Sequence, residues 1–69
     1  MLKVAVSVSE LYALAKEMRD DGMDYVFVSI MEEDPKNDFP LCLHFEASTL
    51  NPSSGMTDYE FLDDISSTL

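Results

Sequence analysis

Two short segments rich in strand-forming residues constrain the fold of this chain most strongly. Residues 25–31 read YVFVSIM and residues 41–48 read LCLHFEAS, and β-branched and aromatic residues of this kind favour strands. The segment between them contains two prolines and several acids, which is typical of a loop. Two strands joined by a connection of this length predict an antiparallel hairpin with a long, exposed loop.

The first part of the chain changes from strand periodicity to helix periodicity. Residues 2–6 alternate in side-chain character and predict a short strand. Ser7 and Glu10 then have the spacing of a capping box, in which each side chain pairs with a free backbone N–H of the first helical turn. We therefore expect a helix over about residues 8–21, closed by Gly22 in a left-handed conformation.

The last part of the chain predicts a second, shorter helix. Thr57 and Glu60 repeat the capping-box spacing, and apolar residues follow at helical intervals. A strand that uses Tyr59 and Phe61 is the alternative for this segment. The whole chain, residues 1–69, is expected to form one small acidic domain.

The predicted helix and sheet each have one apolar face. The helix stripe consists of Val8, Leu11, Leu14, Ala15 and Met18. The sheet face consists of Val26, Val28, Ile30, Leu41, Leu43, Phe45 and Ala47. Packing these faces together predicts the α+β class, as a small two-layer sandwich of order β-α-β-β with a short C-terminal helix on or beside the sheet. The order of the strands stays open.

Size and cysteine content indicate the cellular compartment of such a chain and the interactions that stabilise its fold. A 69-residue chain buries only a marginal core, and domains this small often depend on disulfides, a metal or a partner. The single cysteine cannot form a bridge within the chain and fits a reducing compartment. No signal peptide or membrane-spanning stretch is apparent, so we expect a soluble, cytoplasmic protein.

Charge excludes some classes of partner. Fourteen acids and four bases give a formal net charge of −10, and no lysine or arginine follows Lys36. Such a surface repels phosphate backbones and anionic membranes, so direct nucleic-acid binding and membrane binding are not expected. A hydrophobic content of 46% is too high for a disordered acidic tail, so the chain is expected to fold.

The segment 41–48 also places three reactive side chains on one strand face. Cys42, His44 and Glu46 alternate with apolar residues and are candidate zinc ligands by residue type. However, no CxxC or HxxxH motif accompanies them, and they offer at most three ligands. A catalytic Cys–His pair lacks an orienting partner. We therefore predict no metal, no cofactor and no catalytic residue, and we interpret the trio as part of the outer sheet face.

The same outer face is unusually apolar and predicts a contact with protein. Tyr25, Phe27 and Met31 lie on it beside His44, and aromatic residues and methionine are enriched at interfaces. The alternative is that the C-terminal segment covers this face. The chain is thus expected to be a non-catalytic protein-interaction module, either a homodimer or an accessory subunit of a larger protein.

A second hypothesis is an acidic inhibitor that imitates nucleic acid. Its target would be a nuclease or another DNA- or RNA-binding protein. It is motivated by the base-free second half of the chain, with its cluster Asp58, Glu60, Asp63 and Asp64. A mimic of this kind needs a dense, ordered row of acids.

Overall fold

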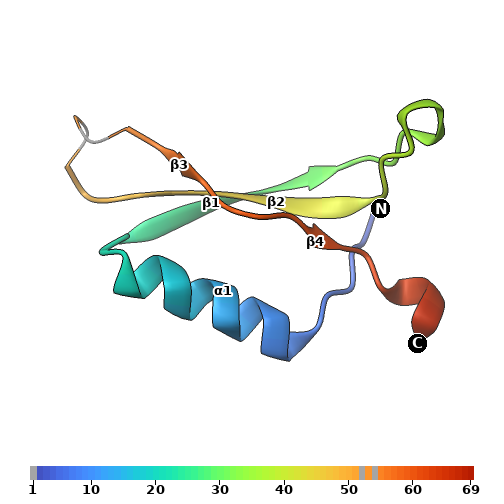
Figure 1. Cartoon of the computed structure of the whole chain (residues 1–69), viewed down its shortest axis with the longest axis horizontal. Coiled ribbons are helices and arrows are strands. Elements are labelled where there is room, and N and C mark those ends of the chain that lie inside the picture. The colour runs from blue at the N-terminus through green and yellow to red at the C-terminus, as the bar shows by residue number, and fades with distance from the viewer. Residues whose placement is uncertain (1, 52, 54) are drawn as a thin grey trace.

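The structure is a computed structural model of the chain, and it describes residues 2–51, 53 and 55–69. The elements are α1 (Val8–Asp20), β1 (Tyr25–Met31), η1 (Pro35–Asn37), β2 (Cys42–Ser48), β3 (Thr57–Asp58), β4 (Leu62–Asp63) and η3 (Ser66–Thr68). Figure 1 shows α1 packed along one face of the sheet. The fold is therefore α+β, as the sequence predicted, with a helix on a four-stranded antiparallel sheet.

The C-terminal end of α1 forms as the sequence predicted, and at the N-terminal end the Ser7 half of the predicted capping box is present. The Ser7 side chain accepts a hydrogen bond from the backbone N–H of Glu10. At the other end, Gly22 has a φ of 84°, and the Met23 N–H donates to the carbonyl of Met18. A left-handed residue followed by this bond is the Schellman motif. In the described part of the chain, no helix is both long and apolar enough to cross a membrane.

The sheet is arranged around β2. Strand β1 pairs with one edge of β2 in antiparallel register, and the short strands β3 and β4 pair with its other edge. The register sets Val28 opposite Phe45 and Ala47 opposite Val26. Cross-strand partners point to the same face of a sheet, so the face that carries Phe45 also carries Val26 and Val28.

The buried core is small and lies between α1 and the centre of the sheet. Its members are Leu14, Met18, Phe45, Ala47 and Leu62. Leu14 and Met18 are the buried residues of α1, whereas Val8, Leu11 and Ala15 of the predicted stripe are exposed. The helix therefore buries a narrower stripe than its sequence pattern suggests.

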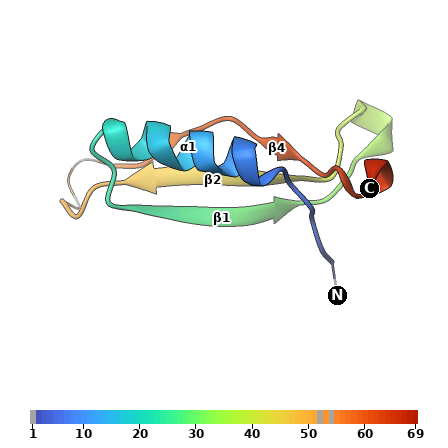
Figure 2. The same cartoon turned by 90° about the horizontal axis from the view of Figure 1, so that it is seen from below.

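The helix does not cover β1, which corrects the prediction that one apolar sheet face is fully buried. Figure 2 shows α1 lying over β2 and beside β4, while β1 runs outside the helix. The reason is that β2 and β4 supply Phe45 and Leu62 to the core, which draws the helix toward that side of the sheet. Val26, Val28 and Ile30 share the helix-facing side and are nevertheless exposed.

The predicted N-terminal strand is not formed. Residues 2–7 are neither helix nor strand, so the β-α-β-β order is not confirmed. Instead, the Ala5 N–H donates to Asp64 Oδ1 at 2.8 Å, and the Ala5 carbonyl accepts from Ile65 N–H. Two hydrogen bonds lower the pKa of Asp64: the larger effect comes from the Ser66 hydroxyl and the smaller from the Ala5 N–H. This segment is thus anchored to the C-terminal segment and takes no place in the sheet.

The predicted C-terminal helix is not formed either. Residues 57–63 contribute β3 and β4, and the Tyr59 N–H donates to the carbonyl of Phe45. A short isolated helix is marginal, whereas this segment satisfies the second edge of β2 and buries Leu62. The segment forms two short strands followed by η3, but Tyr59 and Phe61, which the alternative placed in a strand, lie between β3 and β4.

Tyr59 also joins the C-terminal segment to the end of α1. Its hydroxyl donates to Asp21 Oδ2 at 2.7 Å. This hydrogen bond, together with desolvation and the charge of Asp21, raises the pKa of Tyr59 to about 12. Since an unfolded tyrosine has a pKa of about 10, the stabilisation is complete below about pH 10 and is lost between about pH 10 and pH 12.

We expect the tyrosinate absorbance of Tyr59 to appear near pH 12 in the folded protein. The measurement is a spectrophotometric titration near 295 nm, with Tyr59→Phe identifying the transition of this residue. Asp21→Asn removes the acceptor charge and should return the pKa of Tyr59 toward its ordinary value. A wild-type Tyr59 that already ionises at about pH 10 in folded protein would show that this bond is not made.

Candidate functional site

Strand β1 is the most unusual surface of the molecule. All seven of its residues are exposed, although six of them are apolar or aromatic. Phe27 retains 58% of its accessible surface and Val28 retains 53%, and these two side chains point to opposite faces of the sheet. An apolar strand exposed on both faces is atypical of a monomer, because large contiguous apolar patches generally mark interaction sites.

The hydrogen-bonding pattern of β2 shows which backbone groups of β1 are free. On its β3 and β4 side, the carbonyls of Leu41 and Phe45 accept bonds. Backbone groups alternate in direction along a strand, so His44 and Glu46 direct theirs toward β1. Their partners there are Ser29 and Phe27.

By the same alternation, the backbone N–H and C=O groups of Val26, Val28 and Ile30 point away from β2. In the described residues, no strand pairs with this second edge of β1. The edge also lacks the usual protection against pairing, since β1 contains no charge, no proline and no glycine. Strand β1 therefore presents a long, open, apolar edge.

The outer face next to this edge carries three of the four residues predicted to form an interface. Tyr25, Phe27 and Met31 are exposed, and the rings of Tyr25 and Phe27 meet edge to face with centroids 5.5 Å apart. His44, the fourth residue, is partly covered by Phe61, whose ring centroid lies 5.0 Å away. The C-terminal segment thus covers the β2 part of the outer face and leaves these β1 side chains open.

The trio Cys42, His44 and Glu46 does not form one cluster. Cys42 is only 1% exposed, and burial together with the charge of Asp63 raises the pKa of its thiol. A buried thiol with a raised pKa is a poor ligand and a poor nucleophile. Cys42 therefore belongs to the packing of the sheet.

His44 and Glu46 instead meet Asp58, a residue that was not predicted to join them. Asp58 lies on β3 opposite Glu46. His44 Nδ1 is 3.8 Å from Glu46 Oε1, and His44 Nε2 is 3.5 Å from Asp58 Oδ1. The imidazole is thus held between two carboxylates on the outer face of the sheet.

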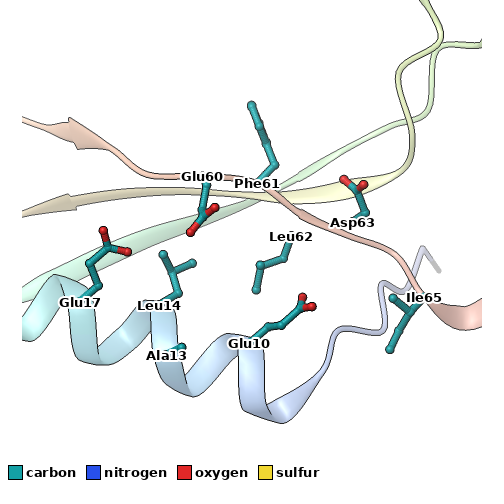
Figure 3. Close-up of a pocket in the computed structure, with 9 residues that line it drawn as sticks. All are labelled: Glu10, Ala13, Leu14, Glu17, Glu60, Phe61, Leu62, Asp63 and Ile65. Atoms are coloured by element: carbon teal, nitrogen blue, oxygen red, sulfur yellow. The ribbon is translucent and has the colours of Figure 1, made fainter.

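Four further acids line a pocket of about 500 Å³ between α1 and the C-terminal segment: Glu10, Glu17, Glu60 and Asp63. Figure 3 shows Leu14 and Leu62 facing one another across it, with the carboxylates of Glu17 and Glu60 at one end and Glu10 toward the other. The carboxylates of this lining attract cationic groups. Apart from this charge, the described lining residues do not indicate which ligand the pocket would bind.

The acids that motivated the nucleic-acid-mimic hypothesis do not lie in one row. Asp58 is beside His44, Glu60 is at the pocket, and Asp64 binds the N-terminal segment. The side chain of Asp63 points away from the helix in Figure 3. The four acids therefore lie in three local environments, with Glu60 and Asp63 both lining the pocket.

Comparison with known proteins assigns no family to this chain. No protein-family model, no curated protein and no solved structure matches it. Any functional conclusion therefore rests on the surfaces described above.

Proposed function

We propose that this protein is a non-catalytic protein-interaction module that associates with a second copy of itself through β1. The observation that carries the proposal is the open edge of β1, which is seven residues long and exposed on both faces. Monomeric proteins protect such edges, because an unprotected edge pairs with any compatible strand. A second copy of β1 is a compatible strand, because it has the same length and the same apolar character.

A two-fold axis through Val28 gives the longest overlap of two β1 strands. It places Val28 opposite its own copy and Val26 opposite Ile30 of the other copy. These are the residues whose backbone groups are free, so each facing pair can exchange two hydrogen bonds. Three such pairs give six bonds and join the two sheets into one continuous sheet, with both helices on the same side.

The pairing also supplies the burial that the isolated chain lacks. Among the described residues, the core cluster against α1 consists of five side chains, whereas six large apolar side chains of β1 are exposed. In the paired arrangement, Phe27 lies opposite Ser29 of the other copy and Tyr25 lies opposite Met31. Since a chain of this size has a marginal core, association with a partner is a common means of support.

Charge opposes this association and gives it a salt dependence. Each copy has a formal charge of −10, and the axis through Val28 sets Asp24 opposite Glu32 at both ends of the paired strands. Like charges facing each other across strands are destabilising. Salt screens them over a Debye length of about 10 Å at 0.1 M. The dimer should therefore become more stable as NaCl is raised from low to moderate concentration.

We expect the wild type to have twice the monomer mass at micromolar concentration in moderate salt. The measurement is light scattering with size-exclusion chromatography. Phe27→Glu removes a large apolar side chain from the contact and adds a negative charge to each copy of an already acidic dimer. Val28→Lys sets two lysines against each other on the axis. Both variants should be monomeric, and circular dichroism should show that they remain folded.

Tyr12→Glu is the matched control, because it also exchanges an exposed aromatic residue for an acid but lies on α1, outside the paired strands. This variant should remain dimeric. A wild type that is monomeric at all concentrations, or open-ended aggregates in place of a discrete dimer, would contradict the proposal. The same conclusion would follow if Phe27→Glu and Val28→Lys kept the wild-type mass.

The nucleic-acid-mimic hypothesis has less support than self-association. It requires a dense row of acids matching the spacing of phosphates, which is about 1.7 Å per charge along duplex DNA. The acids of the second half are divided among three environments. The acidity of the chain is then a property that favours solubility.

A further inference from the structure

The cluster of His44, Glu46 and Asp58 contains a donor set that suits a transition metal. One nitrogen of His44 and one oxygen of each carboxylate lie within 4.8 Å of one another. Imidazole nitrogen and carboxylate oxygen are both common zinc ligands. The sequence pattern Cys42–His44–Glu46 did not reveal this set, because Asp58 is twelve residues further along the chain from Glu46.

The fold places two of the three ligands on one strand, and packing constrains the first of them, His44. His44 and Glu46 are two residues apart on β2, the central strand, so they point to the same face. The ring of Phe61 lies against His44, at an interplanar angle of 33°, and the imidazole is only 20% exposed. Its orientation is therefore constrained by packing before any ion binds.

The third ligand is free to adjust. Asp58 is the register partner of Glu46, and its side chain is 76% exposed. Zinc bound at about 2.0–2.1 Å in tetrahedral geometry needs ligand atoms about 3.3 Å apart. Rotation of the exposed Asp58 side chain and the partly exposed Glu46 side chain can reduce the present separations of up to 4.8 Å.

We propose that His44, Glu46 and Asp58 bind one divalent transition-metal ion of the zinc type, with water as the remaining ligand. The charge of the ion balances the two carboxylates, on a protein whose net charge of −10 attracts cations. Calcium and magnesium prefer six or more oxygen ligands, which this set does not provide. Since Asp58 is on β3 and the other ligands are on β2, the ion ties the two-residue strand β3 to the sheet.

This inference is independent of self-association through β1, because the ligands lie on β2 and β3. It can be tested with the imidazole NMR signals, since His44 is the only histidine of the chain. We expect titration with ZnCl2 near pH 7 to shift these signals and to saturate at one equivalent. Zinc should also raise the melting temperature, by an amount that MgCl2 at the same concentration does not reproduce.

Asp58→Asn is the decisive variant, because it keeps the shape of an exposed side chain and removes its charge. It should weaken zinc binding by about tenfold or more, the scale on which even supporting residues of metal sites act. Glu60→Gln is the matched control, since it neutralises another exposed acid of the same segment, and it should bind zinc as the wild type does.

Three results would overturn the proposal. The first is a shift of the His44 signals that does not saturate with zinc. The second is equal zinc affinity in the wild type and Asp58→Asn. The third is equal weakening in Asp58→Asn and Glu60→Gln, which would mean that zinc responds to overall charge and not to this cluster.

Discussion

Replacing Phe45 with alanine should unfold a large share of the protein at 25 °C. Phe45 is the largest fully buried side chain on the helix-facing side of the sheet, where it packs with Leu14 and Met18 of α1. Truncation of a buried phenylalanine costs about 3–5 kcal/mol. Domains have roughly 0.05–0.15 kcal/mol of stability per residue, so for a chain this short the loss is comparable with the whole free energy of unfolding.

Urea denaturation followed by circular dichroism measures this loss. Tyr12→Ala is the control, because it removes an aromatic ring that is exposed on α1, and it should change the free energy of unfolding by less than about 0.5 kcal/mol. A loss below about 1 kcal/mol for Phe45→Ala would mean that the helix does not pack on the sheet at this position.

The parts of the fold that depend on neighbouring residues were predictable from the sequence. The helix was expected over about residues 8–21 and is found over Val8–Asp20. Its caps, at Ser7 and Gly22, follow from local backbone chemistry. The hairpin of β1 and β2 was also predictable, because both segments are rich in strand formers and the loop between them contains two prolines.

The parts that depend on distant pairing were not predictable in the same way. The capping-box spacing of Thr57 and Glu60 predicted a helix, but Thr57 pairs with Ala47 of β2 and Glu60 lies between β3 and β4. The alternation of residues 2–6 predicted a strand, but Ala5 pairs with Asp64 and Ile65. In both cases a local pattern was outweighed by hydrogen bonds to residues far away in sequence.

The same distinction between local and distant contacts applies to the candidate sites. His44 and Glu46 were recognised as neighbours because residues two apart share a strand face. Asp58 could not be added to them, since its position depends on the register between β2 and β3. The exposure of Val26 and Val28 was also missed, because their pattern does not reveal which strands the helix covers.

Two proline substitutions should distinguish the edge of β1 that pairs with β2 from the edge that is open. The N–H of Phe27 points toward Glu46 of β2, whereas the N–H of Val28 points to the open edge. These directions follow because the carbonyls of Phe45 and Leu41 point to the other side of β2, and backbone groups alternate in direction along a strand. Proline has no N–H to donate, and strands tolerate it only where the N–H faces solvent. Phe27→Pro should therefore break the pairing of β1 with β2, whereas Val28→Pro should leave that pairing intact.

We expect Phe27→Pro to lose the sheet signal in circular dichroism and Val28→Pro to remain folded but monomeric. Val28→Pro loses dimer mass because it removes both hydrogen bonds that the two copies of Val28 exchange on the axis. Phe27→Ala and Val28→Ala are the controls for the side chains, and each should be folded. Equal unfolding by both prolines would show that the open edge has been assigned to the wrong backbone groups. A folded Val28→Pro that keeps the mass of a dimer would show that the copies meet elsewhere, because a strand without this N–H cannot form the central pair of the proposed contact.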